Sequence, residues 1–253
     1  IRRPPRSTLD RSSAASDVYK RQMPDRVVLI VGAGAGLSAA LAKRCAARGM
    51  AVQLAARNTE KLNVLADEIG AAVYCCDASN FNQVSALFAA LDNGPGAPDL
   101  VVYNPSYRQR APFIELDPDD VYKALMITCY GGFLVGKEAA KRMLIAGQGN
   151  IFFTGASASV KGYKNSAPFA MGKFGLRGLA QSMARELAPN NIHVAHFVID
   201  GGIEGKKHSR TSSNVEDSLL DPDAIADTYL HVYDQPRSAW SWEVELRPWV
   251  EVF

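Results

Sequence analysis

Residues 26–38 read RVVLIVGAGAGLS, and this stretch decides the fold. Its apolar run from Val27 to Val31 is typical of a buried strand, and glycines 32, 34 and 36 then form a tight turn into a helix. Glycines let backbone amides approach an anion closely, and the amino end of a helix favours negative charge. The order strand, glycine turn, helix therefore predicts a site for the pyrophosphate of a dinucleotide. The alternative is a tight strand–helix turn that holds no ligand.

The rest of the chain repeats the alternation of short apolar runs with helical patterns. Further strands are predicted at Ala51–Ala55, Ala72–Cys76, Leu100–Tyr103, Asn150–Thr154, Ile192–Ile199 and Trp242–Leu246. Helices are predicted up to Arg48 and at Thr59–Ile69, Asn80–Leu91, Asp119–Leu144, Ala167–Leu187 and Pro222–Tyr233. Regular alternation of this kind predicts an α/β fold, a Rossmann-like doubly wound parallel sheet of about seven strands with helices on both faces.

Composition limits the classes of protein that the chain can belong to. Of the 253 residues 47% are hydrophobic and 21% charged, and no apolar run reaches the roughly 18 residues of a membrane-spanning helix. Residues 1–22 carry six Lys or Arg and two Asp. Without them, the chain's 28 basic and 26 acidic residues become 22 and 24, a net charge of −2. A nearly neutral body predicts no nucleic-acid partner, and we expect no membrane association.

Residues 1–22 differ from the rest of the chain, and we expect a single domain over 23–253. The segment is basic, rich in Ser and Arg, and shows no helical or strand periodicity. We interpret it as a non-native or disordered leader, or as a targeting signal, and exclude it from the fold. A second polar stretch, Gly205–Asp221, is predicted to be a mobile flap over the crevice of the sheet or else a plain solvent loop.

The four cysteines form no CxxC pair, so neither a disulfide framework nor a zinc site is predicted, and a reducing, cytoplasmic location is expected. His193 and His196 are three apart on a predicted strand. Their side chains should point to opposite faces of the sheet and cannot share a metal ion. No metal is expected.

The end of the second strand predicts the preferred dinucleotide. An acidic side chain there would bind the ribose hydroxyls of NAD, whereas an arginine would accept the 2′-phosphate of NADP. Here the strand ends Ala55-Ala56-Arg57-Asn58, with no acidic residue. Arg57 therefore favours NADP(H), with NAD(H) as the less favoured cofactor.

From Met23 onward the sequence resembles the short-chain dehydrogenase/reductase family. Gly32 and Gly36 match its glycine pattern, with Ser38 where a third glycine is usual, and Asp77 matches the acidic residue after the third strand. The turn after the fourth strand matches in part through Asn104. The resemblance implies oxidoreductase activity on a small-molecule substrate and assembly as a homodimer or homotetramer. With the glycine turn, it predicts cofactor binding by Gly32, Gly34, Gly36, Leu37, Ser38, Arg57, Asn58, Asp77, Ala78, Asn104, Lys173, Gly201 and Ile203.

The family's catalytic positions are altered in this chain. Its Tyr-x-x-x-Lys signature appears as Phe169 to Lys173, so the lysine is kept and the tyrosine hydroxyl is lost. The usual serine position is Ala156, with Ser157 and Ser159 close by, and the usual asparagine falls on Thr128. The pattern resembles a divergent subgroup with Phe in place of the catalytic Tyr.

Another proton donor would be needed, or a substrate that requires no enzymatic proton, such as an activated double bond or an imine. Tyr163, just before the Phe169 helix, is the first candidate, ahead of Tyr103, Tyr107 and Tyr130. The predicted catalytic set is Lys173, Ser157, Ser159, Tyr163 and Phe169, the last as the position of the missing Tyr. The sequence thus predicts an NADP(H)-linked oxidoreductase with an altered donor. The alternative is a catalytically silent dinucleotide sensor or scaffold of the same fold.

Overall fold

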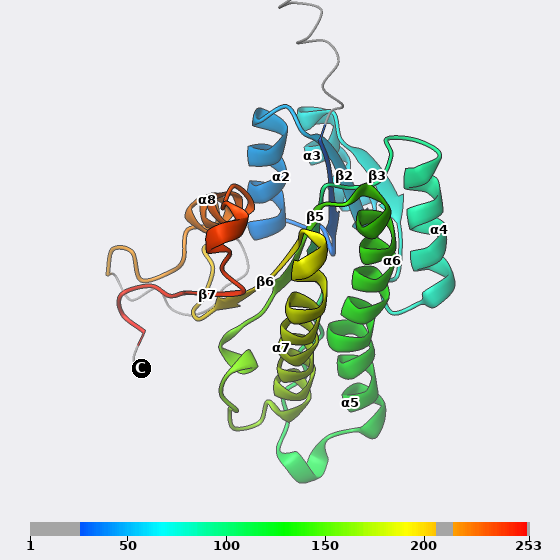
Figure 1. Cartoon of the computed structure of the whole chain (residues 1–253). Coiled ribbons are helices and arrows are strands. Elements are labelled where there is room, and N and C mark those ends of the chain that lie inside the picture. The colour runs from blue at the N-terminus through cyan, green and yellow to red at the C-terminus, as the bar shows by residue number, and fades with distance from the viewer. Residues whose placement is uncertain (1–25, 206–214, 252–253) are drawn as a thin grey trace, which may run out of the picture.

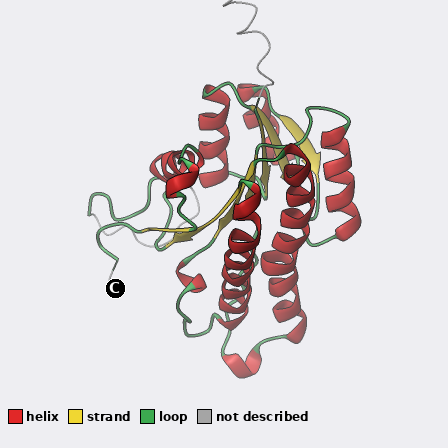
Figure 2. Ribbon diagram, in the orientation of Figure 1, coloured by secondary structure: helices red, strands yellow, loops and turns green. Residues whose placement is uncertain are grey.

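The computed structural model describes residues 26–205 and 215–251, which form a seven-stranded parallel sheet (Figures 1 and 2). Its strand order is β3-β2-β1-β4-β5-β6-β7. The strands are β1 Val27–Val31, β2 Ala51–Ala56, β3 Ala72–Cys75, β4 Leu100–Tyr103, β5 Gly149–Thr154, β6 Ile192–Ile199 and β7 Glu243–Leu246. The predicted leader and the middle of the predicted flap, 206–214, lie outside the described residues.

Helices cover both faces of the sheet, as predicted. One apolar core lies beneath α2 (Leu37–Ala47), α3 (Asn63–Ile69) and α8 (Pro222–Tyr233). The other lies beneath α4 (Phe81–Asp92), α6 (Gly131–Ala146) and α7 (Ala167–Leu187), the set in front and on the right in Figure 1. The described residues contain no helix that is both long and apolar enough to cross a membrane.

The burial of the strands explains why short apolar runs in the sequence predict them. All five residues of β1 and all eight of β6 are buried, because a parallel sheet is covered on both faces, and apart from His193 and His196 these residues are apolar. The strand order reverses beside β1, where β2 lies on one side and β4 on the other. In doubly wound sheets the crevice at such a reversal, at the carboxyl ends of the strands, is where ligands bind.

The predicted single helix Asp119–Leu144 is wrong in its middle. The structure has α5 (Pro118–Leu125), a π-helical turn at Met126–Tyr130, and then α6. The buried hydroxyl of Tyr103 donates a hydrogen bond to the Ile127 carbonyl oxygen inside this turn. A Cβ on Gly131 would stand only 2.8 Å from the Ala78 carbonyl oxygen. This close approach and the inserted hydroxyl account for the irregular turn, a feature that often marks functional sites.

A second local difference concerns the helix predicted at Thr59–Ile69. It begins as a 3₁₀ turn at Glu60–Leu62 before α3, and Thr59 makes no capping hydrogen bond with its side chain. The tighter turn places Lys61 above the glycine turn, as described below.

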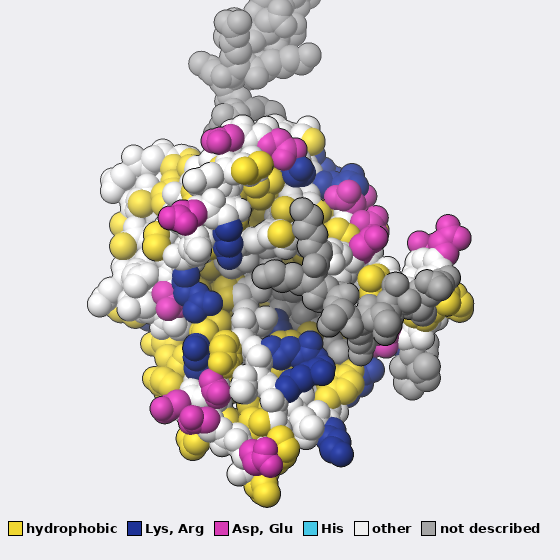
Figure 3. Space-filling model, turned by 180° about the vertical axis from the view of Figure 1, so that it is seen from behind, with side chains coloured by type: hydrophobic (Ala, Val, Ile, Leu, Met, Phe, Trp, Pro, Cys, Tyr) yellow, Lys and Arg dark blue, Asp and Glu magenta, His cyan; other side chains and the backbone are white. Residues whose placement is uncertain are grey.

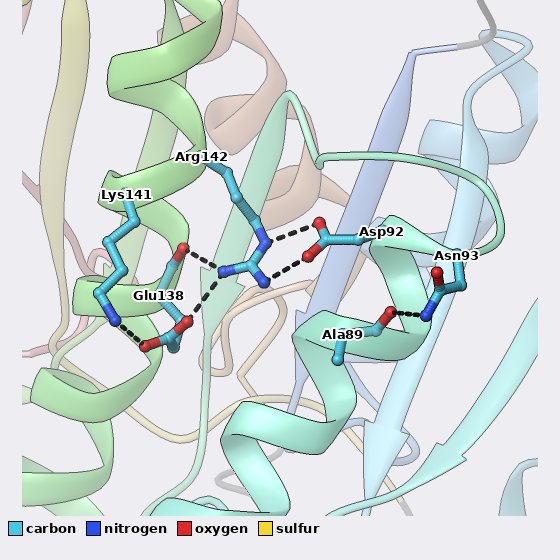
Figure 4. A network of polar contacts seen from close by, with 6 residues as sticks. All are labelled: Ala89, Asp92, Asn93, Glu138, Lys141 and Arg142. Carbon is cyan, nitrogen blue, oxygen red and sulfur yellow. Dashed lines mark hydrogen bonds and ion pairs between the residues drawn. The ribbon is translucent and has the colours of Figure 1, made fainter.

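An ion-pair network joins α4 to α6 at the amino edge of the sheet, away from the crevice (Figure 4). The Arg142 guanidinium donates to both carboxylate oxygens of Asp92, at 2.8 and 2.5 Å, and to Glu138 Oε2 at 2.9 Å. The hydrogen bonds from Arg142 lower the pKa of the Asp92 carboxyl. Bidentate geometry makes such a pair stronger than an ordinary surface ion pair. The network therefore fixes α4 relative to α6, which carries the turn beside Tyr103.

Candidate active site at the carboxyl edge of the sheet

The glycine turn after β1 is shaped by close backbone contacts. Gly32 has φ 78° and Gly36 has φ 83°, the left-handed region that glycine adopts without strain. A Cβ on Gly32 would lie 2.7 Å from the Pro105 backbone nitrogen, so only glycine fits there. The Ala55 carbonyl oxygen accepts hydrogen bonds from the amides of Gly32 and Ala33. The turn is thereby held against the ends of β2 and β4, and Leu37 begins α2 directly after it.

Ser38 and Asn104 connect the glycine turn to the loop after β4. The Asn104 side-chain amide donates to Ser38 Oγ at 2.7 Å, and its backbone amide donates to the Val31 carbonyl oxygen. Ser38 Oγ in turn lies 3.4 Å from the Gly32 carbonyl oxygen. Ser38, which stands where a third glycine is usual, therefore links the glycine turn to the loop after β4.

Asp77 and Ala78 lie on the loop after β3, on the same edge of the sheet. The Asp77 carboxylate accepts from the backbone amide and the hydroxyl of Ser79, and Ala78 is buried. These bonds orient the carboxylate at the carboxyl end of β3.

A basic rim lies beside the glycine turn. Arg57 and Asn58 are exposed at the end of β2, as the sequence predicted. Sequence reasoning missed Lys61, whose Nζ lies 4.0 Å from the point where a Cβ on Gly34 would stand. Its position four residues after Arg57 is the signal that could have identified it. Arg57 and Lys61 thus place positive charge close to the glycine turn.

Lys173 of α7 is buried at the centre of the site. Its Nζ donates a 2.6 Å hydrogen bond to the carbonyl oxygen of Thr154, the last residue of β5. Burial lowers the pKa of Lys173 to about 7, because an ammonium loses its hydration there. An ammonium carries three donors, so this geometry leaves others for a ligand.

A buried polar cluster lies behind Lys173. His196 of β6 is fully buried, with Nδ1 3.0 Å from Glu243 Oε2, and Arg177 donates to both carboxylate oxygens of Glu243 at 2.6 and 2.8 Å. Burial lowers the pKa of His196 to about 4, against the opposing effect of Glu243. His196 is therefore neutral at physiological pH and adds no positive charge beside Lys173.

His196 and His193 lie on opposite faces of the sheet, as their spacing predicted. His193 stacks on Trp240 with ring centroids 4.6 Å apart and meets Phe152 of the core beneath α2 and α8. Within 26–205 and 215–251, no group of His, Cys, Asp and Glu could hold a metal ion.

Phe169 occupies the position four residues before Lys173 and is nearly buried. The Lys173 ammonium lies 5.9 Å from its ring centroid, and the Arg108 guanidinium carbon lies 5.1 Å from the same centroid. Arg108 comes from the loop after β4 and was not among the predicted residues. Two cations thus surround a ring that has no proton to give.

The two candidate serines differ in accessibility. Ser159 is fully buried, and its hydroxyl accepts a 3.1 Å hydrogen bond from the amide of Ala156. Ser157 is partly exposed on the same 3₁₀ turn. Of the two hydroxyls, Ser157 is the one with surface open to a ligand.

Most of the candidate tyrosines already have partners. Tyr103 donates to the Ile127 carbonyl oxygen, and Tyr107 donates to Asp120 Oδ1 at 2.7 Å. The latter bond raises the pKa of the Tyr107 hydroxyl. Thr128, at the usual asparagine position, is buried and its hydroxyl accepts from the Tyr107 amide at 3.2 Å. Tyr130 lies partly exposed in the π-helical turn and stacks on Phe133.

Tyr163 differs, because a lysine and a carboxylate accompany it. It is 44% exposed, and the Lys161 ammonium lies 5.7 Å from its ring centroid. The Tyr163 hydroxyl and then the Asp200 carboxylate raise the pKa of Lys161. Lys161 Nζ also lies 3.4 Å from Asp200 Oδ2 at the end of β6. Arg247 pairs with the same carboxylate oxygen at 3.8 Å.

The predicted cofactor residues after β6 border the same edge. A Cβ on Gly201 would lie 2.6 Å from Pro248 Cδ, so the C-terminal segment packs directly on it. Ile203 pairs with Leu220 in an isolated parallel bridge. The segment just before the predicted flap is therefore joined to the end of that flap.

Comparison with known proteins agrees with this geometry. Residues 26–212 match the family model described as short chain dehydrogenase. The chain is 28% identical over 221 residues to carbonyl reductase family member 4 of Xenopus laevis, covering 83% of this chain and 92% of that protein. It is 30% identical over 184 residues to trans-4-hydroxycyclohexanecarboxylate dehydrogenase of Sinomonas cyclohexanicum, covering 68% and 71%.

Solved structures give the same result. A short-chain dehydrogenase from Rhodopseudomonas palustris is 39% identical, with a TM-score of 0.77 over 89% of this chain and 99% of that one. A metagenomic short-chain oxidoreductase solved with NADP has a TM-score of 0.78 at 24% identity, over 89% and 98%, a likeness of fold. The chain belongs to the short-chain dehydrogenase/reductase family of oxidoreductases.

The burial of Lys173 predicts a specific pH dependence of stability. Its folded pKa of about 7 is below the unfolded value of about 10.4, so between these pH values the unfolded chain binds the extra proton and wild-type stability rises with pH. Without cofactor, Lys173→Met should be the more stable protein at pH 6, and its advantage should shrink toward pH 10. Urea unfolding at several pH values measures this, with Lys43→Met, at an exposed ion pair on α2, as the control for charge removal. An advantage that is the same at every pH would contradict it.

Proposed function

We propose that this protein is an NADP(H)-dependent oxidoreductase that transfers hydride to or from a small organic substrate, with a proton donor other than residue 169. The observation that carries the proposal is the position of the buried Lys173 ammonium, beside the Phe169 ring and at the same edge of the sheet as the glycine turn. Gly32, Gly36 and Lys173 of the family's pattern are kept, whereas the tyrosine hydroxyl that donates the proton is replaced by Phe169.

The residues present fit a nicotinamide dinucleotide. Gly32 and Gly36 hold a turn that a Cβ would obstruct or strain, so backbone amides can approach a pyrophosphate. Asp77 and Ala78 would border the adenine, and Asn104, Gly201 and Ile203 the nicotinamide side. Lys173 would bind the nicotinamide ribose with the donors that Thr154 leaves unused.

NADP(H) is favoured over NAD(H) by charge. A 2′-phosphate adds negative charge near the end of β2, where Arg57 is exposed, and Lys61 adds a second cation beside Gly34. The sequence Ala55-Ala56-Arg57-Asn58 offers no carboxylate to bind the ribose hydroxyls of NAD.

Titration of residues 23–253 with NADPH and NADH, followed by cofactor fluorescence, tests this specificity. NADPH should bind at least tenfold more tightly than NADH, and Arg57→Ala should weaken NADPH binding about tenfold, because a charge-assisted hydrogen bond is lost, while NADH binding changes little. Arg185→Ala, an exposed arginine at the far end of α7, is the matched control. Equal loss of both cofactors in Arg57→Ala would contradict the 2′-phosphate assignment.

The proton that accompanies hydride transfer needs a new source, because Phe169 has none. General acid catalysis is worth about 10²–10⁴-fold, so its loss would add about 3–5 kcal/mol to the barrier. Tyr163 is supported as the donor by its exposure and by the Lys161 ammonium 5.7 Å from its ring centroid. The cation would stabilise the phenolate left after proton transfer.

In the proposed reduction, NADPH held by the glycine turn and Lys173 would supply a hydride to the substrate carbon. Tyr163 gives its phenolic proton to the substrate oxygen, Lys161 stabilises the resulting phenolate, and Asp200 holds Lys161 in place. Ser157 would hydrogen-bond the same oxygen, while Lys173 would orient the ribose. In the oxidative direction each proton and hydride moves in reverse.

Steady-state kinetics on a panel of ketones, quinones and enones tests this donor. Tyr163→Phe should lower kcat about 100-fold at saturating NADPH and leave cofactor affinity unchanged, because only the proton transfer is affected. Tyr107→Phe is the matched control, since its hydroxyl is already bound to Asp120. Full activity in Tyr163→Phe would exclude it as the donor.

A catalytically silent sensor or scaffold is the second candidate, favoured by the loss of hydroxyl or amide groups at Ala156, Phe169 and Thr128. It predicts cofactor binding with no turnover of any acceptor in the panel, and activity that appears only in Phe169→Tyr. Turnover by the wild-type protein would exclude it.

We further propose a cytoplasmic homodimer or homotetramer. The four cysteines are free, which suits a reducing compartment. Four large apolar side chains are 38–48% exposed on the adjacent π-helical turn, α6 and α7, namely Tyr130, Phe133, Met171 and Phe174. Such a contiguous apolar surface is typical of a subunit contact.

Light scattering coupled to gel filtration tests the subunit contact. The wild-type protein should have the mass of a dimer or tetramer, and Phe174→Glu should reduce it to a monomer, because a charge would be buried in the contact. Val64→Glu, at a residue 80% exposed on α3, should not change the mass. A monomeric wild-type protein would contradict the proposal.

A further inference from the structure

Ser166, the residue just before α7, has a buried hydroxyl without a partner. Its side chain is 2% exposed, and Ser166 Oγ makes no hydrogen bond within the described part of the chain. A serine at this position usually caps the helix by accepting from a backbone amide of the first turn, and here the side chain makes no such bond. A buried hydroxyl that is left unpaired costs stability. The Ser166 hydroxyl is therefore a candidate group for binding a ligand.

Ser166 lines a cavity that is otherwise mainly apolar. The cavity has a volume of about 280 Å³ and lies between the loop after β4 and the loop before α7. Its apolar walls come from Ala111, Phe113, Leu116 and Ala167. Pockets of this kind, apolar with a few placed polar groups, are typical of small-molecule sites. The cavity therefore suits a small apolar body that offers a hydrogen-bonding group to Ser166.

The wall from the loop after β4 ends in an exposed apolar turn. Phe113 and Ile114, in the turn Phe113–Glu115, are 78% and 92% exposed. Figure 1 shows this turn at the lower end of the molecule, and Figure 3, seen from behind, shows hydrophobic side chains at the same end. Exposed apolar side chains beside an apolar cavity favour an apolar ligand.

Tyr163, the proposed proton donor, lines the same cavity as Ser166. The two residues belong to one tight turn, in which the Ser166 amide donates to the Tyr163 carbonyl oxygen at 3.2 Å. Two hydroxyl groups therefore border one apolar space, and each can donate a hydrogen bond to an oxygen of a ligand. A molecule with two oxygen groups on one apolar body could bind both hydroxyls at once.

The charges around the cavity favour a neutral ligand. Lys164 is the one charged residue that lines it, and this side chain is exposed to solvent. None of the described residues that line the cavity is acidic. A charged group placed beside the buried Ser166 hydroxyl would lose its hydration without gaining an ionic partner, whereas a carbonyl or ether oxygen loses much less.

We propose that the substrate is a small neutral ketone, or the corresponding alcohol, whose apolar body carries a second oxygen group that accepts a hydrogen bond from Ser166 Oγ. The apolar body lies in the cavity, and the reacting oxygen lies beside Tyr163. The proposal rests on the proposed function, because it names the substrate class of that same site. Ser166 is then a specificity-determining residue, which takes no part in hydride or proton transfer.

Calorimetric titration with matched ketones tests the proposal without turnover. The pairs are cyclohexane-1,4-dione with 4-methylenecyclohexanone, and chroman-4-one with 1-tetralone. In each pair a carbon group replaces the second oxygen and keeps the shape, and the two pairs differ in the spacing of their oxygens. The titrations are done without cofactor and with saturating NADP⁺, which cannot give a hydride. The measured quantity is the affinity ratio of the oxygenated ketone to its partner.

Removal of the Ser166 hydroxyl should lower this ratio about fivefold or more for at least one pair, because one neutral hydrogen bond is lost. Ser166→Ala and Ser166→Gly should both show the loss. Lys164→Met, at the neighbouring residue that also lines the cavity, is the matched control and should keep the wild-type ratio. A ratio that is the same in the wild type and in both Ser166 variants, for both pairs, overturns the proposal.

Thermal unfolding without ligand separates binding from a structural role of Ser166. Ser166→Ala should unfold at the wild-type temperature or above it, because the buried hydroxyl makes no hydrogen bond and caps no amide of α7. A clear fall in the unfolding temperature would show that the hydroxyl stabilises the helix, and would overturn its assignment to a ligand.

Two further results separate the alternatives. If 4-oxocyclohexanecarboxylate binds more tightly than cyclohexane-1,4-dione, and Lys164→Met removes the difference, the neutral class is overturned in favour of an anion held by Lys164. Failure to bind NADP⁺ and NADPH overturns the proposed function. The titrations without cofactor do not depend on that function, and they still decide whether Ser166 binds the second oxygen.

Discussion

The hydrogen bond from Lys173 Nζ to the Thr154 carbonyl oxygen joins α7 to the carboxyl end of β5, at the centre of the candidate site. It holds a cation in a fully buried position, which lowers the pKa of Lys173 to about 7. A buried, unpaired ammonium costs stability, and proteins keep such groups chiefly where they act on a ligand. His196, which lies behind Lys173, is neutral and therefore adds no second positive charge there. The burial of Lys173 therefore favours a role in which its ammonium donates hydrogen bonds to the hydroxyl groups of a ligand.

The Phe at position 169 changes which parts of the reaction the protein can assist. In the proposed function, the dinucleotide is bound and oriented by the glycine turn, the basic rim and Lys173, none of which involves the missing hydroxyl. Proton transfer is a separate task, and the Tyr163–Lys161–Asp200 group offers the same pairing of phenol and cation on a neighbouring loop. The Arg108 guanidinium carbon lies 5.1 Å from the centroid of the Phe169 ring, so the ring packs against a cation.

Much of the architecture was predictable because local pattern and tertiary environment agree. The central strands are mainly apolar because both faces of a parallel sheet are covered, and the glycine turn after β1 marks the change from strand to helix. That Phe169 and Lys173 share one face of a helix was predictable, because their spacing of four residues matches the helical repeat. The π-helical turn between α5 and α6 was not predictable from the local sequence, because it depends on the Tyr103 hydroxyl, which comes from a strand distant in sequence. Arg108 and Lys61 were missed because a loop side chain gains its partners only when loops from different strands meet at one edge.

The most direct test of the central claim is hydride transfer from NADPH carrying deuterium on one face of the nicotinamide C4, followed in a single turnover with a quinone acceptor. The account predicts that one of the two labelled forms slows NADPH oxidation, that its deuterium appears in the product, and that Lys173→Met abolishes the transfer while Phe169→Leu retains it. Oxidation that ignores the label on both faces, or that survives unchanged in Lys173→Met, would contradict the account.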